Sequence, residues 1–156
     1  MAEQWLIDGY NLLRALQSSQ SKKNHLTREQ LFELAAQFAS FTKSGVLMVL
    51  DGVGSNDELQ AHNTENFHVV FSQKISADTY IEQYLYQERG KLSMIVVTDD
   101  RAITHIARGG GAQVLGTALF AENLEQCRKH RSEILNKEES RGHGFHRPFE
   151  DKLKDL

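Results

Sequence analysis

Four short apolar runs, separated by longer and more polar segments, constrain the fold of this chain more than any other feature. They occupy residues 5–7, 46–50, 67–71 and 94–97, and a shorter fifth run covers 113–115. Runs of this length are typical of buried strands. Strands that alternate with helices form a mainly parallel sheet with helices on both faces. The sequence therefore predicts an α/β fold, arranged as a three-layer α/β/α domain.

The segments between the runs carry helical signals. Leu31, Leu34 and Phe38 share one face of a helix predicted over residues 26–41. Thr27 and Gln30 have the spacing of a capping box at its start. Further helices are predicted at 76–89, with Ser76 as its N-cap, at 101–108, ended by three glycines, and at 117–140.

Two segments are predicted to interrupt this alternation. Residues 53–66 are polar and rich in Gly and Asn, which favours a loop. Residues 141–148 contain the only proline and predict a break before a last short helix at 149–156. We expect residues 1–140 to form one domain and 141–156 to form an extension packed on it or tethered to it.

Aspartates stand where the predicted strands end. Asp8, Asp51 and the pair Asp99 and Asp100 follow three strands, and Asp78 lies in the first turn of the helix after another. Right-handed crossovers place the carboxyl ends of parallel strands at one edge, where open α/β sheets hold their active sites. Crowded carboxylates repel one another unless a cation neutralises them. All-oxygen ligands suit Mg²⁺ or Mn²⁺, which serve chemistry on phosphates.

Each aspartate also has an ordinary structural explanation. Asp51 precedes a glycine, as in many turns. Asp78 is placed to complement a helix dipole, and Asp99 or Asp100 to cap the next helix. Asn11 is suited to cap a helix or to hold a ligand or water beside Asp8. Because independent turns and caps do not explain why all the carboxylates gather at one edge, their joint placement favours a metal site.

At these positions the chain resembles a known family. Residues 6–13, Leu-Ile-Asp-Gly-Tyr-Asn-Leu-Leu, resemble the opening motif of NYN domains, a branch of the PIN-like nucleases. Residues 49–52, 69–72, 76–82 and 96–100 resemble the later motifs of the bacterial YacP-type subfamily. The motifs occur in order over nearly the whole chain.

The resemblance implies a PIN-like α/β/α fold and a divalent-metal-dependent endoribonuclease. Such an enzyme cleaves single-stranded RNA with a metal-activated water, and Mg²⁺ or Mn²⁺ is the implied cofactor. By position, Asp8, Asp78 and Asp100 would be the metal ligands. Asn11 would support Asp8, and Asp99 would be an additional acidic residue of the catalytic site. The role of Asp51 stays open. The YacP-type resemblance also implies mRNA on the ribosome as the target.

Basic residues supply candidate contacts to the RNA backbone. The net charge is −3, but residues 128–147 carry six Lys and Arg against three Glu. This asymmetry indicates either phosphate binding or a solvated helix face. The candidate RNA-binding residues are Lys74, Arg101, Arg108, Arg128, Lys129 and Arg131. The His-rich segment 141–147 is interpreted as a contact to RNA or ribosome, or as a hinge.

Several other classes of protein are disfavoured. The chain lacks the Asp-X-Asp pattern of α/β phosphatases, a Gly-X-X-X-X-Gly-Lys loop and a Gly-X-Gly-X-X-Gly turn. A non-catalytic RNA- or ribosome-binding protein with a structural ion remains the main alternative. One cysteine, the absence of a signal-peptide pattern at the first residues and the lack of a long apolar stretch predict a cytoplasmic protein without a membrane span. The sequence leaves the oligomeric state open.

Overall fold

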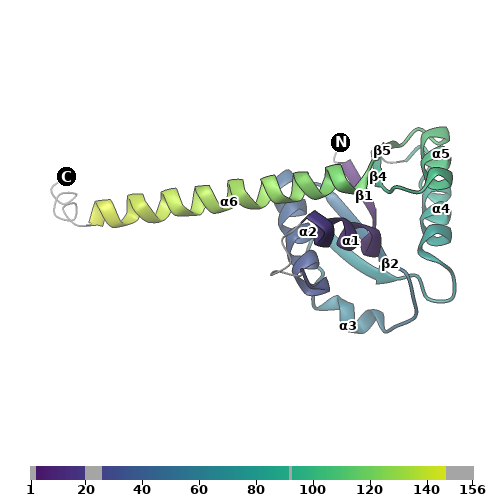
Figure 1. Ribbon diagram of the computed structural model, residues 1–156, viewed down its shortest axis with the longest axis horizontal. Helices are drawn as coiled ribbons and strands as arrows, with labels where there is room; N and C mark the ends of the chain where they lie inside the picture. The colour runs from purple at the N-terminus through teal and green to yellow at the C-terminus, as the bar shows by residue number, and fades with distance from the viewer. Residues whose placement is uncertain (1–2, 20–25, 92, 147–156) are drawn as a thin grey trace. The chain divides into compact units, whose positions relative to one another are not determined.

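The computed structural model describes residues 3–19, 26–91 and 93–146 (Figure 1). The chain divides into two compact units, Met1–Leu124 and Glu125–Leu156. The first unit contains the whole sheet, and the described part of the second unit is helical. The predicted boundary at residue 140 stays a prediction.

A five-stranded sheet with only parallel pairings forms the centre of the first unit, in the order β3-β2-β1-β4-β5. The strands are β1 (Glu3–Asp8), β2 (Gly45–Leu50), β3 (Phe67–Phe71), β4 (Ser93–Val97) and β5 (Gln113–Leu115). This confirms the predicted α/β class and parallel sheet. From β1 the chain proceeds outwards to β2 and β3, and then returns to add β4 on the other side of β1. The strand order therefore reverses between β1 and β4, the place where open sheets form a crevice at their carboxyl ends.

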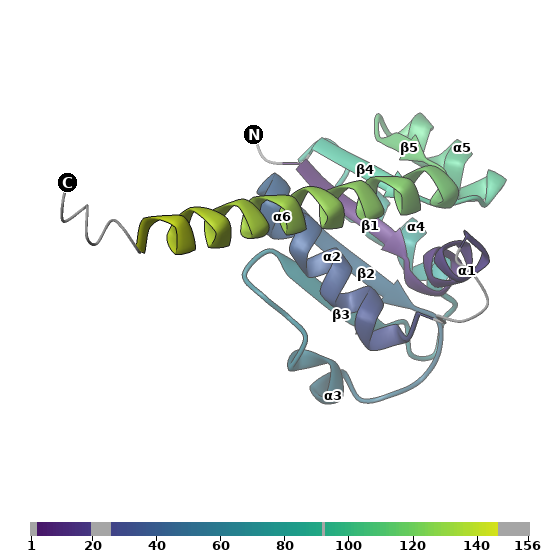
Figure 2. The same ribbon diagram turned by 60° about the vertical axis from the view of Figure 1, so that its left-hand side comes forward.

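Helices cover both faces of the sheet, as Figures 1 and 2 show. The helices are α1 (Gly9–Ser19), α2 (Arg28–Thr42), α3 (Asn56–Gln60), α4 (Ala77–Gln87), α5 (Arg101–Gly109) and α6 (Thr117–His146). On one face, Ile81 of α4 and Ile103 of α5 pack in a core with Leu6 of β1. On the other face, the ring of Trp5 lies 5.1 Å from Phe38 of α2 and 5.1 Å from Phe120 near the start of α6. The three layers therefore enclose two apolar cores, one on each face of the sheet.

Local capping explains where two of the predicted helices begin. Thr27 accepts a hydrogen bond from the Gln30 backbone, and the Gln30 side chain accepts one from the Thr27 N–H, which completes the predicted capping box of α2. Ser76 caps α4 by accepting from the Thr79 N–H. Lys43 ends α2 in the left-handed region at φ 55°.

Three helical segments differ from the sequence-based expectations. Helix α1 was not predicted, although Leu12 and Leu16 are buried one turn apart on it. Residues 53–66 are not wholly a loop, because α3 forms there with Ser55 as its cap and Leu59 buried.

Helix α6 also continues through 141–146, where a break was predicted. The glycines there lower helix propensity by about 1 kcal/mol each, but they do not stop a helix as proline does. The predicted short helix at 149–156 lies outside the described residues. Within the described ranges, no helix combines the length and apolarity that a membrane span requires.

Candidate active site

The predicted carboxylates lie at the carboxyl edge of the sheet. Asp8 is the last residue of β1, and only 7% of it is exposed. Two residues earlier, Leu6 points into the core under α4 and α5, and strand alternation gives Asp8 the same direction. Asp78 is the second residue of that covering helix α4. Asp51 follows β2, and Asp100 follows β4.

Asp8 is held by the first turn of α1. The Asn11 side-chain amide donates to Asp8 Oδ2 at 2.8 Å, and the Asn11 backbone N–H donates to Oδ1 at 3.4 Å. One turn further along α1, the Arg14 guanidinium donates to Asn11 Oδ1. Because the guanidinium occupies the amide oxygen, the amide nitrogen of Asn11 must face Asp8. These hydrogen bonds connect Arg14, Asn11 and Asp8 in one series.

Gly9 allows this close arrangement. A Cβ atom at Gly9 would lie 2.6 Å from Leu50 Cδ2 and 2.9 Å from Met48 Cγ, both on β2. A larger residue would push α1 away from the sheet or displace these two side chains. Glycine therefore permits the tight turn from Asp8 into α1.

Electrostatic interactions link the carboxylates at this edge. Burial raises the pKa of Asp8, and the charges of Asp78 and Asp51 raise it further. The Asn11 N–H bond and the Arg14 charge act in the opposite direction. The pKa of Asp78 is also raised, first by burial and then by the charges of Asp100 and Asp51. A cation at this edge would offset the repulsion between these carboxylates.

Asp51 and Asp99 also have structural partners. Asp51 Oδ1 accepts from the Ala77 N–H at 2.9 Å, which ties the end of β2 to the start of α4. Asp99 accepts from the Thr117 N–H at 3.0 Å and from the Thr117 hydroxyl at 2.5 Å, which anchors the start of α6. The bonds from the Ala77 and Thr117 N–H groups satisfy helix-start donors that have no partner within their own helices.

Asp100 is the N-cap of α5. Its Oδ1 accepts from the Ile103 N–H at 3.0 Å, and its own N–H donates to Thr98 Oγ1 at 3.0 Å. The capping explanation offered by the sequence is therefore correct for Asp100. A cap uses one carboxylate oxygen, so the same residue retains an oxygen for a cation.

The oxygen atoms at this edge are of the type that binds a hard divalent ion. Carboxylate and amide oxygens are the ligands that Mg²⁺ and Mn²⁺ prefer. Among the described residues, no three Asp, Glu, His or Cys side chains are already grouped as a metal site. Binding an ion between Asp8, Asp78 and Asp100 would therefore require their side chains to turn towards one another.

A cavity of about 390 Å³ lies at the reversal of the strand order, between α1 and the residues that follow β4. Its lining consists of Asn11, Arg14, Ala15, Ser18, Asp99, Asp100 and Thr117. Arg14 is not among the predicted site residues, because the sequence pattern does not predict α1. The three-residue spacing from Asn11 to Arg14 on a helix was the signal that would have identified it.

The predicted RNA-binding residues are more dispersed. Lys74 lies before the start of α4, and Arg101 is the first residue of α5, which places both near the carboxyl edge. Both residues are exposed. Arg108 is exposed in the last turn of α5, about 10 Å along the helix from Arg101. The remaining three, Arg128, Lys129 and Arg131, are exposed in the second unit.

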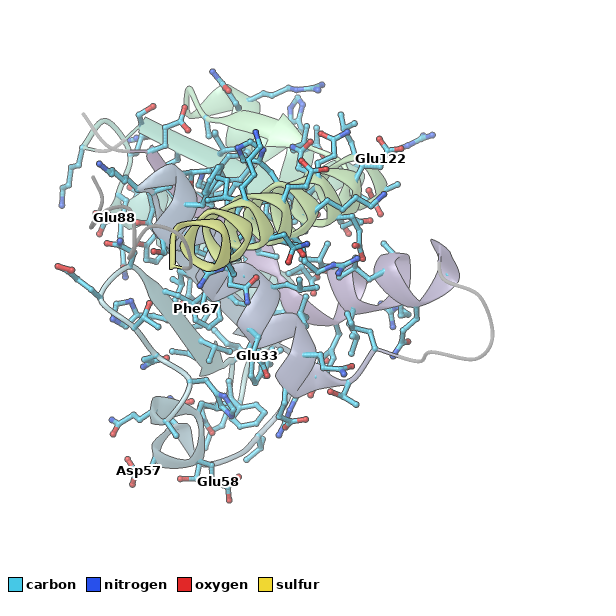
Figure 3. All side chains as sticks on the ribbon, turned by 90° about the vertical axis from the view of Figure 1, so that its left-hand side faces the viewer. Glu33, Asp57, Glu58, Phe67, Glu88 and Glu122 are labelled. Carbon is cyan, nitrogen blue, oxygen red and sulfur yellow. The ribbon has the colours of Figure 1, made fainter. Side chains whose placement is uncertain are left out.

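Several other acidic side chains lie elsewhere on the described part of the chain. Glu33 on α2, Glu88 at the end of α4 and Glu122 on α6 lie apart from one another in Figure 3. Asp57 and Glu58 are both exposed in the first turn of α3. These carboxylates therefore serve as comparison positions for the ones at the carboxyl edge.

The comparisons with known proteins agree with this architecture. The model of the family described as the YacP-like NYN domain matches residues 5–155. The fold is similar to a crystal structure of Rae1 (YacP) from Bacillus subtilis, with a TM-score of 0.72 and 22% identity over 97% of this chain and 91% of that one. A point mutant of the same protein gives a TM-score of 0.69 and 23% identity over 88% and 84% of the two chains. No curated protein sequence matches significantly.

Proposed function

Because the chain belongs to the family of YacP-like NYN domains, we propose that it is a divalent-metal-dependent endoribonuclease that cleaves single-stranded RNA. Family membership supports a nuclease-type domain that acts on RNA. The observation that carries the proposal is the placement of Asp8, Asp78 and Asp100 at the carboxyl edge, where Asn11 donates to the Asp8 carboxylate.

The chain's own residues divide the work at this edge. Asp8, Asp78 and Asp100 would hold Mg²⁺ or Mn²⁺, and Asn11 keeps the Asp8 carboxylate in a fixed orientation. When bound, such an ion supplies a water of lowered pKa and neutralises charge on the scissile phosphate. Burial of Asp8 strengthens its interaction with a cation, because the surroundings screen charge less than water does.

Asp51 and Asp99 are assigned a positioning role in this proposal. Asp51 fixes the start of α4, the helix that carries Asp78. Asp99 fixes the start of α6 beside the cavity. Direct participation of Asp99 in catalysis stays a prediction.

We further propose that the target is mRNA on cytoplasmic ribosomes. The support is the YacP-type resemblance together with the exposed basic residues Arg128, Lys129 and Arg131. Arg128 also pairs with Glu125 at 2.9 Å, an exposed ion pair that RNA phosphates can replace at little cost.

The test compares cleavage of a labelled single-stranded RNA with and without ribosomes, in Mn²⁺ and in EDTA. The wild type is compared with Asp8→Asn and with Asp57→Asn, which removes an exposed carboxylate of α3. We expect metal-dependent cleavage by the wild type and Asp57→Asn, and none by Asp8→Asn. The products should carry 5′-phosphate and 3′-hydroxyl ends.

Full activity in pure Asp8→Asn would contradict the proposal. RNA or ribosome binding without cleavage under any of these conditions would favour the non-catalytic alternative. Stimulation by ribosomes bears only on the proposed target, so the nuclease assignment and the target are tested separately.

A further inference from the structure

Arg14 holds the Asn11 amide at the carboxyl edge, but the proposed function does not explain why this side chain is a guanidinium. It lies on α1 one turn after Asn11, and its guanidinium donates to the Asn11 amide oxygen. The side chain is exposed, so neither packing nor a buried charge requires an arginine here. Its interaction with Asn11 needs only one N–H of the five that a guanidinium carries.

The cavity beside Arg14 is open to a ligand. Its volume of about 390 Å³ falls in the range of small-ligand sites. Asn11 and Asp100 line it together with Arg14. A group bound there would therefore lie beside the carboxylates that the proposed function assigns to the metal.

The acidic residues of this cavity are already engaged with helix starts. Asp99 accepts two hydrogen bonds from Thr117 at the start of α6. Asp100 accepts from the Ile103 N–H at the start of α5. Because the positive end of a helix dipole offsets a capping carboxylate, these two charges oppose an incoming anion less than free carboxylates would.

We propose that this cavity is a subsite for a phosphodiester group of single-stranded RNA, bound by the Arg14 guanidinium while it continues to hold Asn11. A guanidinium is planar and presents its donors as a fork, which matches two phosphate oxygens. The lysine ammonium lacks this geometry. The inference rests on the proposed function for its choice of RNA, and it adds a residue and a position that hold the strand.

The connection through Asn11 gives the subsite a second consequence. The same guanidinium contacts the amide that orients Asp8, so the bound phosphodiester and the metal-binding carboxylate share one hydrogen-bonded series. RNA that occupies the subsite is thereby aligned with Asp8. A substitution at Arg14 should accordingly weaken RNA binding more than it affects folding.

The test measures binding of a short labelled single-stranded RNA by fluorescence anisotropy, in EDTA and again in Ca²⁺. The wild type is compared with Arg14→Met, Arg14→Lys and Arg89→Met. Arg89 is an exposed arginine at the opposite edge of the sheet, where its guanidinium lies over Tyr86. Thermal unfolding midpoints of all four proteins should agree.

We expect Arg14→Met to weaken binding about tenfold, the loss typical of one charge-assisted contact. Its plot of log affinity against log salt should be shallower by about 0.7, the value for one phosphate contact on a single strand. Arg14→Lys should keep the wild-type slope and recover only part of the affinity. Arg89→Met should behave as the wild type.

The inference is overturned if Arg14→Met binds within twofold of the wild type with the same salt slope. It is also overturned if Arg89→Met loses as much affinity, or if the wild type binds RNA in neither condition. Cleavage by the wild type in Mn²⁺ is scored separately. If the wild type cleaves RNA but its binding does not depend on Arg14, only this inference is wrong. If binding depends on Arg14 but the wild type does not cleave RNA, only the nuclease proposal is wrong.

Discussion

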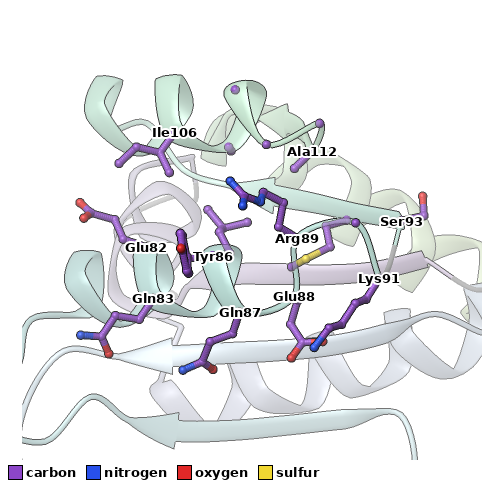
Figure 4. A pocket seen from close by; sticks show the side chains of 17 residues that line it. Glu82, Gln83, Tyr86, Gln87, Glu88, Arg89, Lys91, Ser93, Ile106 and Ala112 are labelled. Atoms are coloured by element: carbon purple, nitrogen blue, oxygen red, sulfur yellow. The ribbon is translucent and has the colours of Figure 1, made fainter.

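The two edges of the sheet are both hollowed, but they differ in chemistry. At the amino edge, a cavity of about 890 Å³ lies between the ends of α4 and α5, with Leu85, Met94 and Ile106 in its lining (Figure 4). At the carboxyl edge the cavity is smaller, about 390 Å³, and Asp100 and Arg14 line it. Size alone would select the amino edge, whereas the aspartates that we propose as metal ligands lie at the carboxyl edge.

The direction of the helices explains this difference. In a parallel sheet with helical crossovers, helices begin at the carboxyl edge and end at the amino edge. Asp51, Asp99 and Asp100 each bind an N–H at a helix start, so acidic residues are stabilised at the carboxyl edge. Helix ends at the amino edge offer carbonyl groups, which give no such support to carboxylates.

The largest expected effect comes from removing a charge at the carboxyl edge. Asp78→Asn should lower the rate of metal-dependent RNA cleavage by at least about a hundredfold, since it removes a group proposed to hold the ion. Glu82→Gln, on the same helix but beside the amino-edge cavity, is the matched control. Equal loss in both variants would mean that the two edges do not differ in function.

The dependence of the free energy of unfolding on pH tests the burial of the Asp8 carboxylate. The pKa of Asp8 is raised by burial, so the folded state binds its proton more tightly than the unfolded state does. The contribution of Asp8 to stability is therefore present below the unfolded pKa and is lost as pH rises through the folded pKa. Asp8→Asn should gain unfolding free energy relative to the wild type over that range. Urea unfolding at a series of pH values checks this, and a gain in the opposite direction would contradict it.

Substitution of Asp51 tests whether its hydrogen bond to the start of α4 stabilises the fold. Asp51→Ala removes the bond to the Ala77 N–H and should cost about 1 kcal/mol, as the loss of a helix cap does. Glu65→Ala, at an exposed loop position, should change the free energy of unfolding by less than about 0.5 kcal/mol. Urea denaturation measures both values. If Asp51→Ala cost no more than Glu65→Ala, the tie between β2 and α4 would be unimportant for stability.

The smallest effect is expected at the amino edge. Tyr86 is 71% exposed beside the larger cavity. Tyr86→Ala should therefore leave RNA cleavage within about twofold of the wild type, because surface changes away from a site are usually small. Initial rates in Mn²⁺ provide the measurement. A loss comparable to that of Asp78→Asn would place functional chemistry at both edges.

The parallel sheet and its acidic edge were predictable because they depend on local patterns. Short apolar runs identify strands, and the residue after each run must lie at the strand's end. The spacing of Thr27 and Gln30 likewise predicts the start of α2. These signals require no knowledge of what lies across the sheet.

The contacts that complete the site depend on tertiary packing. Asp99 meets Thr117 only because β4 and β5 pair in a particular register, which no spacing in the sequence encodes. Arg14 was missed because its helix begins directly after Asp8 with a glycine, a poor helix former. Buried Leu12 and Leu16 stabilise that helix through packing, which outweighs local propensity.

Calorimetric titration with Mn²⁺ tests the central claim most directly, because it measures the ion at the carboxyl edge without requiring cleavage. The wild type and Asp57→Asn should bind with the same affinity. Asp8→Asn should bind at least about tenfold more weakly, since a charged ligand is lost. Wild-type affinity in Asp8→Asn, or the absence of binding in the wild type, would contradict the assignment of this edge as a metal site.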